Sequence, residues 1–176
     1  MANKQALREL QTRLAERMQA ARTQPRGQSW LAVECRGHGL LLPLEQAGEI
    51  FAVVPLLEVA HTQPWFAGVA NLRGGLYGVV DLARFLGLPD APDAVGREQA
   101  RLVAIGATLG LNSALLVDRL AGLRTSDQLR AEADDSEAAA RPAFAPTCWR
   151  DVDGRRWQSI DLAALAKDVR FLSIVA

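Results

Sequence analysis

The sequence has little of the chemistry on which enzymes and metalloproteins usually depend. Its 176 residues include only two cysteines and two histidines, and their positions match no metal-ligand spacing. The sequence contains no GxSxG, GxxxxGK or GxGxxG motif, which argues against the common hydrolase, nucleotide and dinucleotide sites. We therefore expect a protein without catalytic residues, without a bound metal and without a cofactor.

An excess of charge and a long apolar run are missing as well. The 20 basic residues balance the 20 acidic ones, so the whole molecule has no field that would attract nucleic acid. No apolar run approaches the roughly 20 residues that a membrane-spanning helix needs. Two cysteines behind an N-terminus that does not resemble a signal peptide are most simply reduced thiols. We expect a soluble cytoplasmic protein that neither binds nucleic acid nor inserts into a membrane.

The N-terminal segment has the composition of a helix. Residues 3–23 contain no Gly or Pro, are rich in Ala, Arg, Gln and Leu, and end before Pro25 and Gly27. Their narrow apolar stripe fits either a helix packed on its own domain or a short partner-binding helix. We expect residues 1–27 to be a helix and linker that the folded domain at 28–170 can lose without unfolding.

From residue 30 onward, short apolar or alternating runs separated by turn residues are typical of strands. Strands are expected at residues 30–35, 40–44, on both sides of the glycines at 74–75, and at 101–105, 112–117, 149–152 and 157–160. Short helices are expected at 82–86 and 161–167. Residues 45–50 fit either a helical turn or a strand, and residues 124–146 are expected to form a long loop.

The two halves of the chain repeat one pattern. Residues 44–47 resemble residues 117–120, and residues 76–83 resemble residues 156–163. Each copy of the second pattern follows a hairpin glycine. Several short strands with little helix suggest two small barrels of about five strands each. Because each half alone is near the lower size limit for a stable core, we expect the two barrels to pack together.

The central segment resembles the signature of a known family. Residues 68–74 read GVANLRG and residues 79–82 read VVDL, and this pair at this spacing is similar to the signature of CheW-like domains. Further segments that fall in the family's order are 44–50, 62–65 and 115–118. The resemblance covers about residues 28–167, nearly the whole chain apart from the N-terminal segment.

The resemblance implies a mainly β fold of two packed, five-stranded SH3-like barrels, with an N-terminal helix and short helical segments and without catalysis. CheW-like adaptors join the cytoplasmic tips of chemoreceptors to the histidine kinase CheA in bacterial chemosensory arrays. The N-terminal helix and the diverged second half look most like the PilI-like branch, which serves the control of type IV pili and twitching. The implied partners are a chemoreceptor tip and a CheA-type kinase at the inner face of the membrane.

The resemblance also implies which residues bind partners, in a groove between the barrels that suits a receptor's helical hairpin. These residues are Ala47, Glu49, Ile50, Asn71, Arg73, Gly74, Val117 and Leu120. For Ala47, Ile50 and Val117, the alternative is an ordinary core position. An exposed Arg73 would offer a planar donor fork to a partner's carboxylate or backbone, whereas the alternative is an internal bridge between the barrels.

Two other functions stay open at this point. A small hydrolase or transferase would use His61 or Asp81. Against it, Asp81 and Asp161 each precede Leu-Ala and a helix-like segment, where an aspartate is expected to cap the helix. A CheW-like competitor that occupies array positions and inhibits signalling has the same sequence features as a scaffold.

Overall fold

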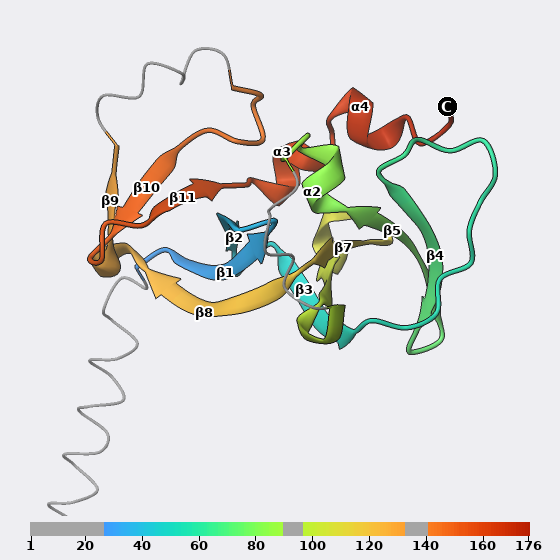
Figure 1. Cartoon of the computed structure of the whole chain (residues 1–176), viewed down its shortest axis with the longest axis horizontal. Coiled ribbons are helices and arrows are strands. Elements are labelled where there is room, and N and C mark those ends of the chain that lie inside the picture. Colours follow the sequence, from blue (N-terminus) through green and yellow to red (C-terminus); the bar gives the residue numbers. More distant parts are fainter. Residues whose placement is uncertain (1–26, 90–96, 133–140) are drawn as a thin grey trace, which may run out of the picture.

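Two curved β-sheets lie side by side in the computed structural model of the chain, which describes residues 27–89, 97–132 and 141–176 (Figure 1). The helix expected at residues 3–23 lies outside these ranges. The strands are β1 (Ser29–Cys35), β2 (His38–Pro43), β3 (Ala47–Ala52), β4 (Phe66–Leu72), β5 (Gly75–Asp81), β6 (Arg101–Ile105), β7 (Ser113–Val117), β8 (Arg119–Thr125), β9 (Leu129–Ala131), β10 (Cys148–Asp151) and β11 (Arg156–Ser159). The short helices α2 (Leu82–Phe85), α3 (Leu162–Leu165) and α4 (Val169–Leu172) follow one side of the sheets.

Hydrogen bonding divides the strands between two barrels. Barrel A is the six-stranded sheet β8-β1-β2-β11-β10-β9, and barrel B is the five-stranded sheet β3-β6-β7-β5-β4. Neighbouring strands are antiparallel except for β2 and β11 in barrel A and β5 and β7 in barrel B, which are parallel. The expected mainly β fold of two packed barrels is confirmed, with β9 as an additional strand in barrel A.

The internal repeat explains this arrangement if each half of the chain contributes one hairpin to the barrel of the other half. β3 and β8 occupy equivalent edges, β5 and β11 each lie beside a parallel neighbour, and β4 and β10 follow them. The β1–β2 hairpin of the first half completes barrel A, whereas the β6–β7 hairpin of the second half completes barrel B. Each barrel therefore contains strands from both halves of the chain.

The exchanged hairpins lie between the barrels and are buried on both faces. Trp30 and Ala32 of β1 belong to the core of barrel A. The alternate residues Leu31, Val33 and Cys35 belong to the core that both barrels share. β6 divides its side chains in the same way between barrel B and the shared core. Burial on both faces explains why these strands read as nearly continuous apolar runs rather than as an alternating pattern.

The helices after the equivalent strands β5 and β11 both begin at an aspartate. The Oδ1 atom of Asp81 accepts a hydrogen bond from the Arg84 N–H at 2.9 Å. The Oδ1 atom of Asp161 accepts one from the Ala164 N–H at 3.0 Å. Each carboxylate satisfies a backbone N–H of the first helical turn, so both expected N-caps are confirmed.

Residues 119–131 differ from the expectation of a long loop after residue 124. They form the edge strand β8, a single 3-10 turn and the short strand β9. β8 is hard to recognise in the sequence because Gly122, with a φ of +93°, lies in a bulge opposite β1. The ambiguous residues 45–50 contribute to strand β3, and residues 133–140 lie outside the described ranges.

Candidate partner-binding site

The hairpin between β4 and β5 closes with a two-residue turn made by Arg73 and Gly74. Leu72 pairs with Gly75, so these two residues occupy the central positions. Their φ angles are +48° and +85°, and a type I′ hairpin turn requires positive φ at both positions. The Asn71 side chain accepts a hydrogen bond from the Gly74 N–H at 2.8 Å. Glycine takes such a φ readily, whereas a residue with a Cβ pays roughly 1–2 kcal/mol.

The Arg73 side chain reaches from this turn to strand β3. Its Nη1 atom lies 2.6 Å from Oε1 of Glu49, and its guanidinium carbon lies 6.0 Å from the centre of the Phe51 ring. The Arg73 and Glu49 side chains remain 76% and 42% exposed. An ion pair this exposed stabilises the fold by only about 0–1 kcal/mol. The ion pair and the Phe51 contact, which is worth about 0.5–1 kcal/mol at an exposed site, together do no more than balance the backbone strain, so local stability gives no clear preference for an arginine at this position.

Glu49 and Arg73 belong to the two opposite edges of the barrel B sheet. β3 stands at one end of the strand order, and β4, which enters the turn, stands at the other. The ion pair thus joins the two edges that the curvature of barrel B brings together. Both partners belong to the same barrel, so this contact is not the internal bridge between barrels that was the alternative for Arg73.

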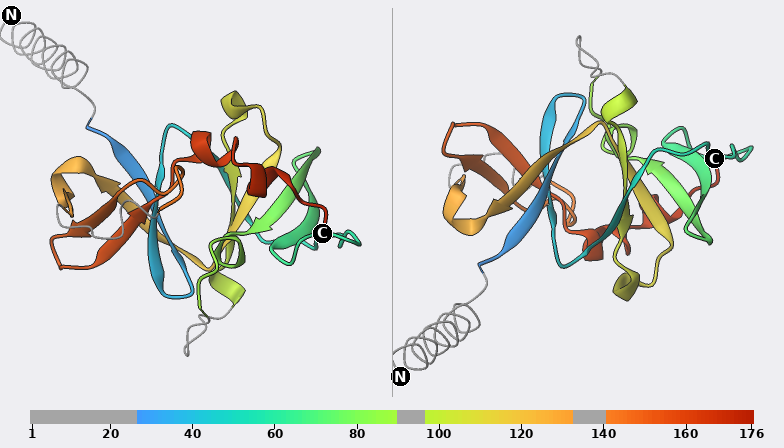
Figure 2. Two further views of the ribbon diagram at one scale, coloured as in Figure 1. Left: turned by 90° about the horizontal axis from the view of Figure 1, so that it is seen from above. Right: turned by 90° about the horizontal axis from the view of Figure 1, so that it is seen from below.

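The remaining predicted residues divide into exposed and buried positions. Ile50 on β3 is 39% exposed and Leu120 on β8 is 36% exposed. Both strands cross the face of the molecule shown on the right of Figure 2. Ala47 is half-buried against the shared core. Val117 is fully buried within that core, so the core alternative holds for its side chain, which is not part of an exposed surface.

A buried carboxylate that the sequence did not single out lies in barrel A. Glu34 on β1 is 4% exposed. It accepts two hydrogen bonds from Arg119 of β8, at 2.6 and 2.7 Å, and pairs with Arg155 at 2.6 Å. Burial alone would raise the pKa of Glu34, but the hydrogen bonds from Arg155 and Arg119 outweigh it and hold the pKa below its ordinary value. The network ties β1 to β8 and to the β10–β11 hairpin.

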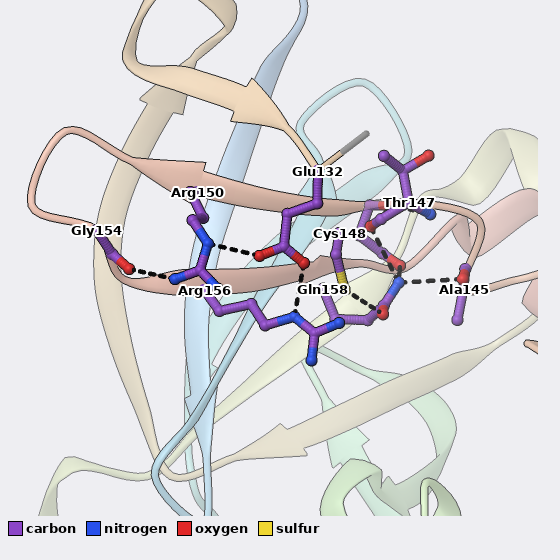
Figure 3. A network of polar contacts seen from close by, with 9 residues as sticks. Glu132, Ala145, Thr147, Cys148, Arg150, Gly154, Arg156 and Gln158 are labelled. Atoms are coloured by element: carbon purple, nitrogen blue, oxygen red, sulfur yellow. Dashed lines mark hydrogen bonds and ion pairs between the residues drawn. The ribbon is translucent and has the colours of Figure 1, made fainter. Parts of the chain in front are cut away.

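A second carboxylate, Glu132, is shared by two arginines of the β10–β11 hairpin. Its Oε1 atom lies 2.7 Å from Nε of Arg150, and its Oε2 atom lies 2.9 Å from Nε of Arg156. Figure 3 shows both side chains converging on this carboxylate. Beside them, the Gln158 amide donates hydrogen bonds to the carbonyls of Ala145 and Thr147, each at 3.0 Å. These contacts fix the hairpin against the segment that precedes it.

Of the two residues named for the enzymatic alternative, the structure gives the side chain of Asp81 a structural contact and His61 a contact of its backbone. Asp81 caps helix α2, and the backbone carbonyl of His61 accepts a hydrogen bond from the Ala176 N–H at 2.9 Å. Within the described ranges, no three His, Cys, Asp or Glu side chains gather in a group that could hold a metal ion. In the same part of the chain, no helix combines the length and hydropathy needed to cross a membrane.

The family follows from comparison with known proteins. A sequence profile of the CheW-like domain matches residues 29–170, and the chain belongs to this family. Its members are non-enzymatic scaffold proteins of chemosensory systems, and this chain is a scaffold of that class.

Two known proteins illustrate the relationship. Protein PilI of Pseudomonas aeruginosa is 28% identical over 151 residues, which cover 84% of this chain and 81% of PilI. The crystal structure of the scaffolding protein TtCheW from Thermoanaerobacter tengcongensis matches with a TM-score of 0.65 and 17% identity. That match covers 80% of this chain and 88% of TtCheW, and it shows that the two proteins share a fold.

Proposed function

We propose that this protein couples the cytoplasmic tip of a chemoreceptor to a CheA-type histidine kinase, in a cytoplasmic array at the inner face of the membrane. CheW-like scaffold proteins in general couple receptors to kinases of this type, and family membership supports that role here. The likeness to PilI over most of the chain supports a system that controls type IV pili and twitching. In this proposal, residues 28–170 are the adaptor domain and residues 1–27 are an appended segment.

The observation that carries the proposal is the strained and exposed Arg73. Its backbone adopts a conformation that is unfavourable for any residue with a Cβ, and its exposed ion pair with Glu49 stabilises the fold only slightly. A guanidinium has five N–H donors, more than the single Glu49 carboxylate uses. A partner that brings a carboxylate or carbonyl to the remaining donors gains charge-assisted hydrogen bonds. Strained residues of this kind cluster at binding sites.

The surroundings of Arg73 suit a helical partner. Glu49 and Ile50 on β3 supply a charge and an exposed apolar side chain, and Arg73 pairs with Glu49. Leu120 supplies a second exposed apolar side chain on β8, the edge strand of barrel A. An amphipathic helix binds a surface of this kind through its apolar stripe, with polar contacts at the margin. We propose that the receptor tip contacts this surface, which consists of Ala47, Glu49, Ile50, Asn71, Arg73, Gly74 and Leu120.

The direct test is a titration of the full chain against a purified receptor tip and a purified kinase. Changing Arg73→Ala should weaken binding to at least one partner by roughly 1–3 kcal/mol, because a charge-assisted contact loses one side. The matched control is Arg84→Ala, which removes another exposed arginine of barrel B, paired with Asp81 at 3.4 Å. The control should bind as the unaltered chain does. The proposal would be refuted if the unaltered chain bound neither the receptor tip nor the kinase. It would also be refuted if Arg73→Ala and Arg84→Ala lost the same amount of binding affinity.

A further inference from the structure

Two leucines of β8 project from one side of the barrel A sheet although they are exposed. Leu120 is 36% exposed and Leu123 is 57% exposed. Leu123 pairs with Leu31 of β1, which belongs to the shared core. Leu120 pairs with Val33, which belongs to the same core. Residues that pair directly across two strands share a face of the sheet, so both leucines lie on the side that bears the shared core.

Leu44, which directly follows β2, is a third exposed leucine on that side. Its backbone N–H donates a hydrogen bond to the Ser29 carbonyl at 2.9 Å, which extends the pairing of β1 with β2 by one residue. Side chains alternate along a strand, and Leu42, two positions earlier, belongs to the shared core. Leu44 is 43% exposed. We call Leu44, Leu120 and Leu123 the leucine surface, because exposed apolar side chains grouped on one side of a protein mark interaction surfaces.

The N-terminal residues, which lie outside the described ranges, join the fold beside this surface. Ser29, the first residue of β1, pairs with Thr125, the last residue of β8. Leu123 is two positions before Thr125, and Leu44 bonds to Ser29. The start of β1 and the end of β8 lie side by side in Figure 2. Residues 1–26 are therefore tethered next to the leucine surface.

The sequence of this segment supplies a complementary apolar stripe. Its long apolar side chains recur at spacings of three and four residues, and they are Leu7, Leu10, Leu14 and Met18. This spacing places them on one side of a helix. A helix over residues 3–23 would be roughly 30 Å long at about 1.5 Å per residue. The seven residues of β8 span roughly 23 Å, so one such helix is long enough to cover the strand.

Charge favours contact between the segment and the folded part of the chain. Residues 1–26 contain six basic and two acidic residues, and because the whole chain is neutral, the other 150 residues carry a net charge of −4. The arginines of β8 lie on the side of the sheet opposite the leucines. Arg119 pairs with Glu34 at 2.6 Å, and Arg124 lies 5.4 Å from the centre of the Trp157 ring. The leucine side of β8 therefore opposes no arginine to a basic segment.

We propose that residues 3–23 form a helix that docks on the leucine surface of the same chain and covers part of the partner surface. The covered residue is Leu120, which belongs to both surfaces, and this regulatory part of the inference rests on the proposed function. A receptor tip then binds only the fraction of molecules in which the segment is displaced. The apparent affinity for the tip falls in proportion to that fraction.

The docking is tested by hydrogen exchange of the full-length chain, measured by mass spectrometry without any partner. A single helix of this length is only marginally stable in water, so slow exchange within residues 3–23 reports docking. Replacing Leu10→Ser together with Leu14→Ser should speed that exchange roughly tenfold, if about nine molecules in ten are docked. The matched control Gln5→Ser with Thr12→Ser alters the other side of the helix and should stay within about twofold of the unaltered chain.

The receiving side is tested by Leu44→Ser with Leu123→Ser, two exposed positions outside the proposed partner surface. This variant should speed the exchange of residues 3–23 as the helix variant does. Circular dichroism checks that each variant is folded. The docking would be overturned if neither leucine variant changed the exchange, or if the control changed it equally. Exchange that slows as the protein concentration rises would also overturn it, because the segment would then bind a second copy.

The regulatory part is tested by titrating the same variants with a purified receptor tip. Release of the segment should raise the apparent affinity by the factor by which it speeds exchange, roughly tenfold for Leu10→Ser with Leu14→Ser. Faster exchange with an unchanged tip affinity would show that the segment does not compete with the tip. A chain that binds no tip contradicts the proposed function, whereas the exchange result decides the docking by itself.

Discussion

At the scale of single residues, burial separates two kinds of arginine–carboxylate contact. The Glu34 carboxylate is buried and accepts a bidentate contact from Arg119, so removing it leaves polar groups without a partner inside barrel A. Glu49 and Arg73 are both exposed, and water replaces either partner at little cost. The first contact therefore serves the fold, whereas the second contributes little to the stability of the fold.

Replacing Glu34→Gln should destabilise the chain in a pH-dependent way. The pKa of Glu34 is lower in the folded chain than in the unfolded chain, so ionisation stabilises the fold at neutral pH. This contribution is lost as the pH falls through the folded-state pKa. We expect the variant to lose about 1–3 kcal/mol of unfolding free energy at about pH 7 and less below about pH 4. Urea denaturation over a pH series measures this, and a difference that stays constant with pH would contradict the account.

Sequence patterns predict structural features that involve residues close together in the chain, and they miss contacts between residues that are far apart in the chain. The turn after Asn71 and the caps at Asp81 and Asp161 were predictable, because each involves residues only a few positions apart. The contact between Glu34 and Arg119 spans 85 positions, and a glutamate in a strand is usually expected to face solvent.

At the scale of elements, helix α3 is held by two caps that come from different parts of the chain. Asp161 caps the Ala164 N–H. The Oε1 atom of Gln46 accepts hydrogen bonds from Leu162 N–H at 2.8 Å and Ala163 N–H at 3.3 Å. Gln46 directly precedes β3, the edge strand of barrel B, whereas α3 follows β11 of barrel A. This one side chain therefore fixes the start of an edge strand to a helix of the other barrel.

Replacing Gln46→Ala should cost about 1–2 kcal/mol of unfolding free energy, because two helix N–H groups lose their acceptor. The matched control is Gln63→Ala, which removes one exposed hydrogen bond, to the Val175 carbonyl at 3.1 Å. We expect the control to cost less than about 0.5 kcal/mol. Chemical denaturation of both variants measures the difference. Equal stabilities would show that Gln46 does not tie the barrels together.

At the scale of the whole molecule, the exchange of hairpins makes the two halves interdependent. β1 and β2 pair with β8 and β11, and β6 and β7 pair with β3 and β5, so no sheet is complete within one half. The repeat in the sequence predicted two equivalent units, but it did not predict the exchange. A hairpin would bury a similar apolar run whether it paired with strands of its own half or with strands of the other half. Only the tertiary arrangement shows which barrel each hairpin completes.

Neither half of the chain should therefore fold alone. We expect residues 1–96 and residues 97–176, produced separately, to lack a cooperative thermal transition, because each would expose the shared core and a sheet edge. Mixing the two halves should restore strand structure, as followed by circular dichroism. A cooperative transition in either isolated half would contradict the exchanged arrangement.

The central claim, that Arg73 and Glu49 face a partner, is tested most directly by exchanging their charges. The double variant Glu49→Arg with Arg73→Glu keeps an opposite-charge pair at the same two positions, so its unfolding free energy should change by less than about 1 kcal/mol. The charges presented to a partner are reversed, and binding to the receptor tip or the kinase in a titration should be lost. A stable, charge-exchanged chain that binds both partners as the unaltered chain does would show that the pair only joins the edges of barrel B.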